Sequence, residues 1–159
     1  MAELATVSAE LVRVFLEKQQ TFGTAESLTG GMIAAAVAGV PGASAVLMGG
    51  VVSYDPRVKH ELLGVPQQVI DTVGVVSEPC ARQMAEGARQ SLKVDVAVSA
   101  TGIAGPGGGT EETPVGTVFI GVAGKDGTRV DECHFAGDRQ SVREQAAAYA
   151  LQMALEVIG

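Results

Sequence analysis

The sequence predicts an α/β fold: a single layered domain over residues 1–159, in which helices flank a mixed β-sheet. Length and composition support one domain, because 159 residues with 47% hydrophobic side chains are enough to bury one core. Helical and strand-like segments alternate along most of the chain, which is typical of layered α/β folds. Two consecutive strand-like segments near residue 125 indicate a hairpin, and a hairpin makes the sheet mixed.

The first half of the chain shows two helical and two strand-like patterns. Leu4, Val7 and Leu11 recur at helical spacing, with charged residues on the other side. A run rich in Ala, Val and Ile ends at Pro41, which indicates the end of a buried helix. We expect helices over 3–20 and 28–40, and strands over 21–25 and 45–54.

Capping residues and glycines divide the second half of the chain. Asp55 precedes Pro56, and Ser77 opens a second helical segment in the same way. The segment 101–114 is rich in glycine and predicts a loop, and 124–127 predicts a hairpin turn. We expect helices over 55–63, 77–93 and 140–158, and strands over 94–100, 115–123 and 128–135.

Charge and composition exclude several classes of protein. The formal net charge is −7, which argues against direct nucleic-acid binding, because a surface that follows phosphates must be basic. The amino terminus is acidic and no apolar run approaches the ~20 residues that span a bilayer, so we expect a cytoplasmic protein without a signal peptide or membrane contact. The two cysteines and two histidines form no CxxC or clustered motif, so no metal site is expected.

Ser27 follows the first expected strand and precedes Gly30 and Gly31. A hydroxyl at such a junction can cap the next helix. It can instead act as a nucleophile beside backbone N–H groups that stabilise an oxyanion. Spacing alone leaves both interpretations open.

Lys59 lies about one turn into the helix that Asp55 caps. The helix dipole and burial both disfavour a charged lysine at this position, and both would make it a usable general base. A solvated surface lysine is the alternative. Tyr54, at the end of the preceding strand, either orients such a lysine or packs at the edge of the core.

The loop that begins at Thr101 contains Gly102 and Gly105 within a dense glycine run. It matches neither a P-loop nor the dinucleotide-binding GxGxxG motif. A loop of this length either binds a ligand or is disordered.

Arg139 directly precedes the last expected helix, and Arg143 lies one turn later. Arginines near a helix N-terminus can bind a phosphate, and an Asp138 cap with two surface arginines is the alternative.

These segments together resemble the CinA C-terminal domain family, which includes the nicotinamide-nucleotide amidohydrolases. The resemblance covers nearly the whole chain and rests on motifs that occur in order and in register: Thr24 to Gly31, Gly50 to Tyr54 with Lys59, Leu63 to Val65, Gly74 to Glu78, Thr101 to Gly108, Pro114 to Thr117 and Gly137 to Arg139. It implies a single α/β domain, in agreement with the fold predicted above.

The resemblance also implies an activity: hydrolysis of the carboxamide of nicotinamide mononucleotide (NMN) to nicotinate mononucleotide and ammonia, in pyridine nucleotide salvage. It implies a serine nucleophile and a lysine base, which correspond to Ser27 and Lys59. It implies no cofactor and a homodimer. The implied site is completed by a tyrosine beside the lysine and by substrate-binding residues: Tyr54, Thr101, Gly102, Gly105, Gly30, Gly31 and Arg139.

The sequence departs from the family pattern at a few positions. Leu28 replaces a typical Cys, and Asp55-Pro56 replaces a frequent Ser-Asn, without affecting the Ser-Lys pair. Thr113 replaces a common Lys, which removes a positive charge near the binding loop. A different class of function fits the same motifs, namely a non-catalytic nucleotide- or protein-binding module linked to competence or DNA damage.

Overall fold

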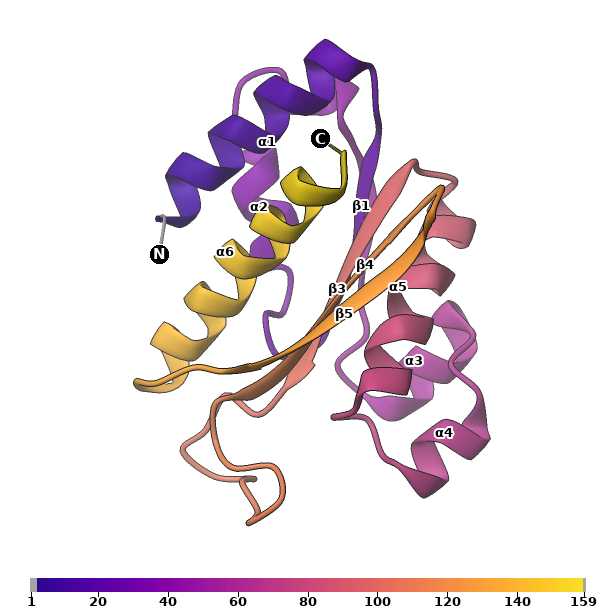
Figure 1. The fold of residues 1–159 in the computed structure, drawn as a ribbon, viewed down its shortest axis with the longest axis vertical. Coiled ribbons are helices and arrows are strands. Elements are labelled where there is room, and N and C mark those ends of the chain that lie inside the picture. The colour runs from indigo at the N-terminus through magenta and orange to yellow at the C-terminus, as the bar shows by residue number, and fades with distance from the viewer. Residues whose placement is uncertain (1–2, 159) are drawn as a thin grey trace.

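A computed structural model describes residues 3–158 of the chain. It contains six α-helices, five strands and one short 3-10 helix (Figure 1). In chain order these are α1 (Leu4–Lys18), β1 (Phe22–Glu26), α2 (Met32–Ala38), η1 (Ala43–Ala45), β2 (Leu47–Val52), α3 (Pro56–Leu63), α4 (Gln67–Thr72), α5 (Glu78–Leu92), β3 (Val96–Gly102), β4 (Thr117–Gly124), β5 (Gly127–His134) and α6 (Arg139–Ile158).

The five strands form one mixed sheet in the order β2-β1-β3-β4-β5. β1 pairs in parallel with both β2 and β3, whereas β4 and β5 are antiparallel to their neighbours. The predicted α/β class, the mixed sheet and the hairpin over 124–127 are therefore confirmed. Because β2, β1 and β3 are parallel, their carboxyl ends lie at the same edge of the sheet.

Helices cover both faces of the sheet. Figure 1 shows α1, α2 and α6 on one side and α3, α4 and α5 on the other. The face under α6 holds the larger apolar cluster, to which α6 contributes closely spaced alanines that let the helix approach the strands. A smaller cluster around Met84 and Cys80 lies under α5. None of the described helices is long and apolar enough to cross a bilayer.

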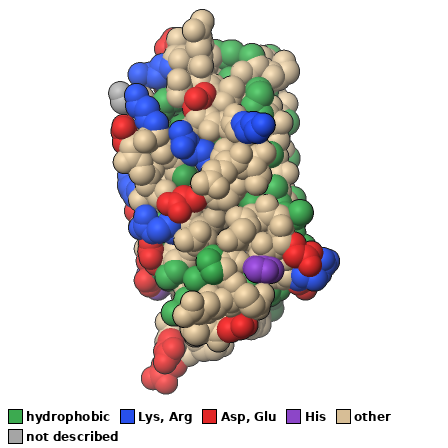
Figure 2. Space-filling view, turned by 90° about the vertical axis from the view of Figure 1, so that its right-hand side faces the viewer, with side chains coloured by type: hydrophobic (Ala, Val, Ile, Leu, Met, Phe, Trp, Pro, Cys, Tyr) green, Lys and Arg blue, Asp and Glu red, His purple; other side chains and the backbone are tan. Residues whose placement is uncertain are grey.

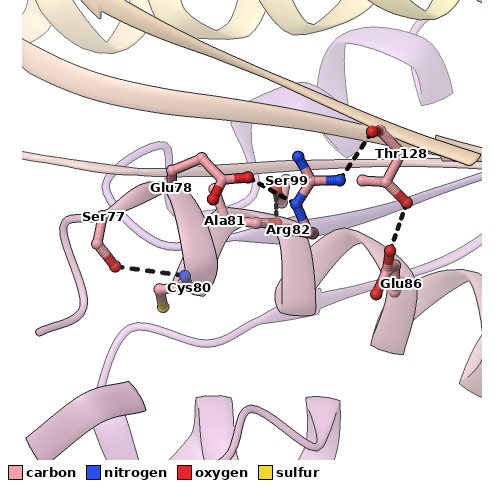
Figure 3. Close-up of polar contacts among 8 residues, drawn as sticks. All are labelled: Ser77, Glu78, Cys80, Ala81, Arg82, Glu86, Ser99 and Thr128. Carbon is pink, nitrogen blue, oxygen red and sulfur yellow. Dashed lines mark hydrogen bonds and ion pairs between the residues drawn. The ribbon is translucent and has the colours of Figure 1, made fainter. Parts of the chain in front are cut away.

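Polar contacts fix α5 against the sheet (Figure 3). The buried Ser99 hydroxyl on β3 donates to the Ala81 carbonyl at 2.7 Å. Arg82 donates to the Thr128 carbonyl at 2.8 Å, and the Thr128 hydroxyl donates to Glu86 at 2.6 Å. These bonds join α5 to the central strand β3 and to the edge strand β5, so the helix cannot slide along the sheet.

The loop between β3 and β4 projects beyond the carboxyl ends of the parallel strands (Figure 1). Two exposed acids, Glu111 and Glu112, lie in this loop, and red side chains mark the projecting end of the molecule in Figure 2. The segment is ordered around a turn in which the Thr110 amide donates to the Thr113 carbonyl at 2.9 Å.

Several expected boundaries were wrong, each for a local reason. The second helix begins at Met32 rather than near 28, because Gly30 and Gly31 have φ angles of 59° and 104° that no helix accommodates. β4 begins at Thr117 rather than 115, because Gly116 turns the chain at φ 95°. α4 and η1 were not predicted; both are short, α4 beginning directly after Pro66 and η1 beginning two residues after Pro41.

Candidate functional site

Three chain segments meet at the shared edge of the parallel strands. Ser27 directly follows β1, Ser53 and Tyr54 follow β2, and Thr101 lies near the end of β3. The register pairs Glu26 with Val52 on one side and with Ala100 on the other, which brings the three segments level with one another. This edge is where α/β folds commonly bind ligands.

Ser27 lies in a turn and does not cap α2. Its amide donates to the Ala100 carbonyl at 2.9 Å, and its carbonyl accepts from the Gly30 amide at 3.0 Å. The N-cap of α2 is Gly31, which provides no side-chain cap. The helix-cap interpretation of Ser27 is therefore wrong, and its hydroxyl is available for other contacts.

Glu26 supplies the missing cap from the end of β1. Its carboxylate is 1% exposed and accepts hydrogen bonds from the Ile33 and Ala34 amides at 2.9 and 3.0 Å. The negative charge at the positive end of α2 stabilises the helix and closes the turn that contains Ser27. Sequence reasoning missed this role, because Glu26 is seven positions before Ile33 and no local capping motif has that spacing.

Lys59 is buried, with 1% of its surface exposed, so the solvated alternative is wrong. Its Nζ donates to Ser27 Oγ at 3.1 Å, to the Ser53 carbonyl at 2.7 Å and to the Tyr54 carbonyl at 3.3 Å. None of the ion pairs among the described residues includes Lys59. The ammonium is thus held by neutral oxygens only.

Burial lowers the pKa of Lys59 below its ordinary value. The charges of Cys80 and Asp55 raise this pKa by a smaller amount. Burial also raises the pKa of the Cys80 thiol to about 11. The thiol is therefore neutral near pH 7 and does not stabilise the Lys59 ammonium at that pH. Arg57 does not add like-charge repulsion, because it forms an exposed ion pair with Glu61 at 2.7 Å. Desolvation is therefore the main cause of the shift.

Tyr54 does not pack into the core, because 58% of its surface is exposed. Its carbonyl contacts Lys59, and its hydroxyl accepts a hydrogen bond from Arg139 at 2.9 Å. Arg139 also donates to the Gly105 carbonyl at 2.7 Å. The arginine at the start of α6 thus joins the end of β2 to the glycine-rich loop.

The glycine-rich loop comes close to its neighbours at both predicted glycines. A Cβ atom added at Gly102 would lie 2.5 Å from the Thr117 carbonyl oxygen, and a Cβ atom added at Gly105 would lie 2.5 Å from the Val115 side chain. Thr101 is buried, and its hydroxyl donates to the Val75 carbonyl at 2.8 Å. Its side chain therefore ties the segment before α5 to the site.

Arg143 reinforces the Ser27 turn from α6. It donates to the Leu28 carbonyl at 2.8 Å and to the Thr29 carbonyl at 3.2 Å. Its guanidinium is thus engaged with the backbone, whereas Arg139 lines the open cleft. The structure thus gives the two arginines different roles, which their positions in the sequence could not distinguish.

A cleft of about 270 Å³ joins these residues, and its lining includes Ser27, Leu28, Tyr54, Lys59, Thr101, Gly102, Gly105 and Arg139. Gly30 and Gly31 are not part of the lining; they shape the turn beneath it. A larger hollow of about 620 Å³ lies at the opposite end of the sheet, beside Lys18 and the β4–β5 turn, and contains none of the predicted site residues. Within residues 3–158, no three His, Cys, Asp or Glu side chains group as metal ligands would.

Comparison with known proteins identifies the family. A sequence model of the CinA C-terminal domain matches residues 4–158. The chain belongs to the CinA C-terminal domain family. A CinA-like protein of Leptospira borgpetersenii is 50% identical over 139 residues, which are 87% of this chain and 33% of that protein. This CinA domain therefore spans about a third of the length of that relative, and similar fractions of several others.

A second kind of relative has nearly the same length. The nicotinamide-nucleotide amidohydrolase PncC of Enterobacter agglomerans is 46% identical over 153 residues, covering 96% of this chain and 93% of that protein. The crystal structure of a competence/damage-inducible protein from Agrobacterium tumefaciens superposes with a TM-score of 0.97 at 34% identity, covering 100% of this chain and 98% of the other. The CinA-superfamily protein of Escherichia coli gives 0.93 at 32% identity, covering 97% and 90%.

Proposed function

We propose that this CinA domain hydrolyses the carboxamide of NMN to nicotinate mononucleotide and ammonia. The family membership and the similarity to a nicotinamide-nucleotide amidohydrolase support an amidohydrolase. The observation that carries the proposal is the Lys59 amine, buried without a carboxylate partner among the described residues and 3.1 Å from the Ser27 hydroxyl. A serine and a desolvated lysine in contact form a nucleophile and a base.

The contacts of Lys59 orient its lone pair in the neutral state. A neutral amine has two N–H bonds and one lone pair, and carbonyl oxygens can only accept. The Ser53 and Tyr54 carbonyls therefore take the two N–H bonds, and the lone pair faces the Ser27 hydroxyl, the one donor among the three partners. This arrangement favours proton transfer from Ser27 to Lys59.

Acylation follows from that geometry. Ser27 Oγ attacks the carboxamide carbon while its proton passes to Lys59 Nζ, and the carbonyl oxygen becomes an oxyanion. Collapse of the tetrahedral intermediate breaks the C–N bond, and the Lys59 ammonium returns the proton to the leaving nitrogen, which departs as ammonia. An ester on Ser27 remains. Water then attacks the ester carbon while Lys59 takes its proton. As the second tetrahedral intermediate collapses, the C–O bond to Ser27 breaks, the Lys59 ammonium returns the proton to Ser27 Oγ, and nicotinate mononucleotide leaves.

The oxyanion needs a donor beside Ser27. The Leu28 amide makes no backbone hydrogen bond with another described residue, and Leu28 lines the cleft. In serine hydrolases with a strand-to-turn nucleophile, the N–H of the residue after the serine fills this role. We assign the same role to Leu28, whose carbonyl Arg143 holds in place at 2.8 Å.

Incubating the purified protein with NMN tests the proposal directly. Chromatography should show nicotinate mononucleotide, and a coupled assay should show one ammonia for each product molecule. The competing function is a nucleotide- or protein-binding module, as the competence-related names of several relatives suggest. Such a module would bind NMN without releasing ammonia, and that result would contradict the amidohydrolase proposal.

A further inference from the structure

The hollow at the amino-terminal end of the parallel strands has no part in the proposed reaction. It measures about 620 Å³, against about 270 Å³ for the cleft at Ser27, and its size is typical of small-molecule sites. Figure 1 shows the last turns of α1 and α6 and the β4–β5 turn together at the top of the molecule. The last turn of α5 contributes Arg89 from the other face of the sheet. Four elements thus border one hollow, at the end of the sheet opposite Ser27.

The cations of the chain gather at two places when they have no carboxylate partner. Of the 11 lysines and arginines, four arginines form ion pairs with carboxylates of the described residues. Three of the other seven lie at the cleft or at the Ser27 turn: Lys59, Arg139 and Arg143. The remaining four lie at the opposite end of the sheet: Lys18, Arg89, Lys93 and Lys125. In Figure 2 most blue side chains accordingly lie in the upper half of the face shown, whereas red ones mark its lower end.

The ends of the neighbouring helices do not require these cations as caps. At the end of α1 the chain turns at Gln19, and the Gln20 amide donates to the Phe15 carbonyl at 2.9 Å. At the end of α5 the Val94 amide donates to the Arg89 carbonyl at 3.2 Å. Backbone N–H groups thus bind carbonyls that a basic side chain could otherwise cap. The basic side chains at these two helix ends are therefore available to a ligand.

Arg89 presents one edge of its guanidinium to the hollow. Its Nε donates to the Asp95 carbonyl at 2.9 Å, which holds the side chain at the rim. The two terminal nitrogens make no hydrogen bond with a described residue, so they can donate together to an anion. The Asp95 carboxylate instead accepts from the Thr21 amide at 2.8 Å and from the Thr21 hydroxyl at 3.0 Å. It forms no ion pair with Arg89 and leaves the guanidinium open.

Apolar side chains line the rest of the hollow. Val96 and Val122 come from the adjacent strands β3 and β4, and Val157 and Ile158 come from the last turn of α6. Val157 is 44% exposed, so a ligand with an apolar ring beside its anionic part would cover it. The lining contains no histidine, cysteine or serine, and the hydroxyl of Thr128 is bound to a carboxylate on α5. The hollow therefore suits binding rather than catalysis.

We propose that this hollow is a binding site for a nucleoside diphosphate, separate from the site of NMN hydrolysis. The apolar side chains contact the base, and Lys18, Arg89 and Lys125 bind the diphosphate. A ligand with more than one negative charge fits best, because the lining has four basic residues and only two acidic ones on a chain with a net charge of −7. The inference does not depend on the proposed function.

Isothermal titration calorimetry with ADP tests this site, with pyrophosphate and adenosine as the two halves of the probe. We expect one ADP to bind per chain, more tightly than either half and less tightly as the salt concentration rises. Lys18→Gln and Lys125→Gln should each weaken ADP binding at least about fivefold. Lys93→Gln is the matched control, because it removes the same charge from an exposed position at the end of α5 that does not line the hollow.

Arg139→Ala distinguishes this hollow from the cleft at Ser27. It should leave the affinity for ADP unchanged within about twofold, because Arg139 lies at the other end of the sheet. A loss of ADP binding in Arg139→Ala would place the ligand in the cleft and overturn the proposal. No saturable binding of ADP up to about 1 mM, or an equal loss in Lys93→Gln and Lys125→Gln, would also overturn it.

The two lysines that carry the test are exposed, so their glutamine variants should keep the fold and a loss of binding reports on the site itself. Calorimetry with ADP involves no hydrolysis of NMN. The proposed function and this second site can therefore fail independently of each other.

Discussion

The pKa of Lys59 reflects a balance at the scale of single atoms. Burial removes water from the ammonium and lowers the pKa, while Cys80 and Asp55 oppose this shift more weakly. Three neutral oxygens hold the amine in place. A carboxylate in place of either carbonyl would stabilise the ammonium strongly and hold the pKa high. The use of neutral oxygens alone therefore positions the amine firmly and still leaves it easy to deprotonate.

Ser27→Ala should lower the rate of NMN hydrolysis by at least about 10³-fold, because the nucleophile is lost and water must attack directly. Stability should change by no more than about 1 kcal/mol, since the hydroxyl does not cap a helix. Product formation and thermal unfolding measure the two effects. Ser91→Ala, at an exposed position of α5, is the control. A Ser27→Ala protein that kept its rate would remove Ser27 from the mechanism.

The rate of hydrolysis should rise with pH through one ionisation that lies below 10.5, the ordinary value for lysine. The sign follows from the role of Lys59: only the neutral amine accepts the Ser27 proton, and the lowered pKa brings that form into reach at lower pH. Lys59→Arg should be nearly inactive at all pH values, because guanidinium keeps its proton. A pH-rate profile of both proteins measures this. Substantial activity of Lys59→Arg would show that the residue supplies charge only.

At the scale of elements, α2 and α6 hold the site from one side of the sheet. α2 depends on Glu26 for its N-terminal cap, and the first turns of α6 carry Arg139 and Arg143 toward the cleft and the Ser27 turn. Neither helix places a side chain on the reacting atoms in the proposed mechanism. Their function is to fix the backbone around Ser27 and the glycine-rich loop.

Glu26→Gln should destabilise the protein by about 1–2 kcal/mol, because it removes the charge at the helix N-terminus and turns one of two acceptor oxygens into a donor that faces an amide. Urea denaturation measures the change in the free energy of unfolding. Glu111→Gln, in the exposed β3–β4 loop, makes the same chemical change at a surface position and should have little effect. Equal stability of the two variants would contradict the capping role.

Arg139→Ala should raise KM for NMN about tenfold or more, and by clearly less for nicotinamide riboside, which lacks the phosphate. The arginine lies at the cleft, where the Gly105 carbonyl and the Tyr54 hydroxyl already fix its guanidinium. Steady-state kinetics with both substrates provides the comparison. Equal losses for the two substrates would indicate that Arg139 only supports the loop and does not bind the phosphate.

At the scale of the whole molecule, the sequence predicted what is local or periodic. The helices opened by Asp55 and Ser77, the hairpin and the α/β class are all confirmed, because capping residues and alternation determine them within a few positions. The contact between Ser27 and Lys59 was implied only by resemblance, since 32 residues separate them and only the pairing of β1 with β2 brings them together. The sequence spacings of the contacts that Glu26 and Arg143 make match no known motif. No pattern in the sequence therefore indicated these contacts.

The bond between Glu26 and the start of α2 makes the intervening segment a closed ring of fixed length. Adding or removing a residue in this segment would move the Ile33 and Ala34 amides away from the Glu26 carboxylate. The same change would move Ser27. Around Glu111 the β3–β4 loop is closed only locally, by exposed hydrogen bonds between Thr110 and Thr113 that hold none of the site residues. Natural variation in length, and any peptide inserted by design, should therefore be tolerated in that loop and rejected between Ser27 and Gly31.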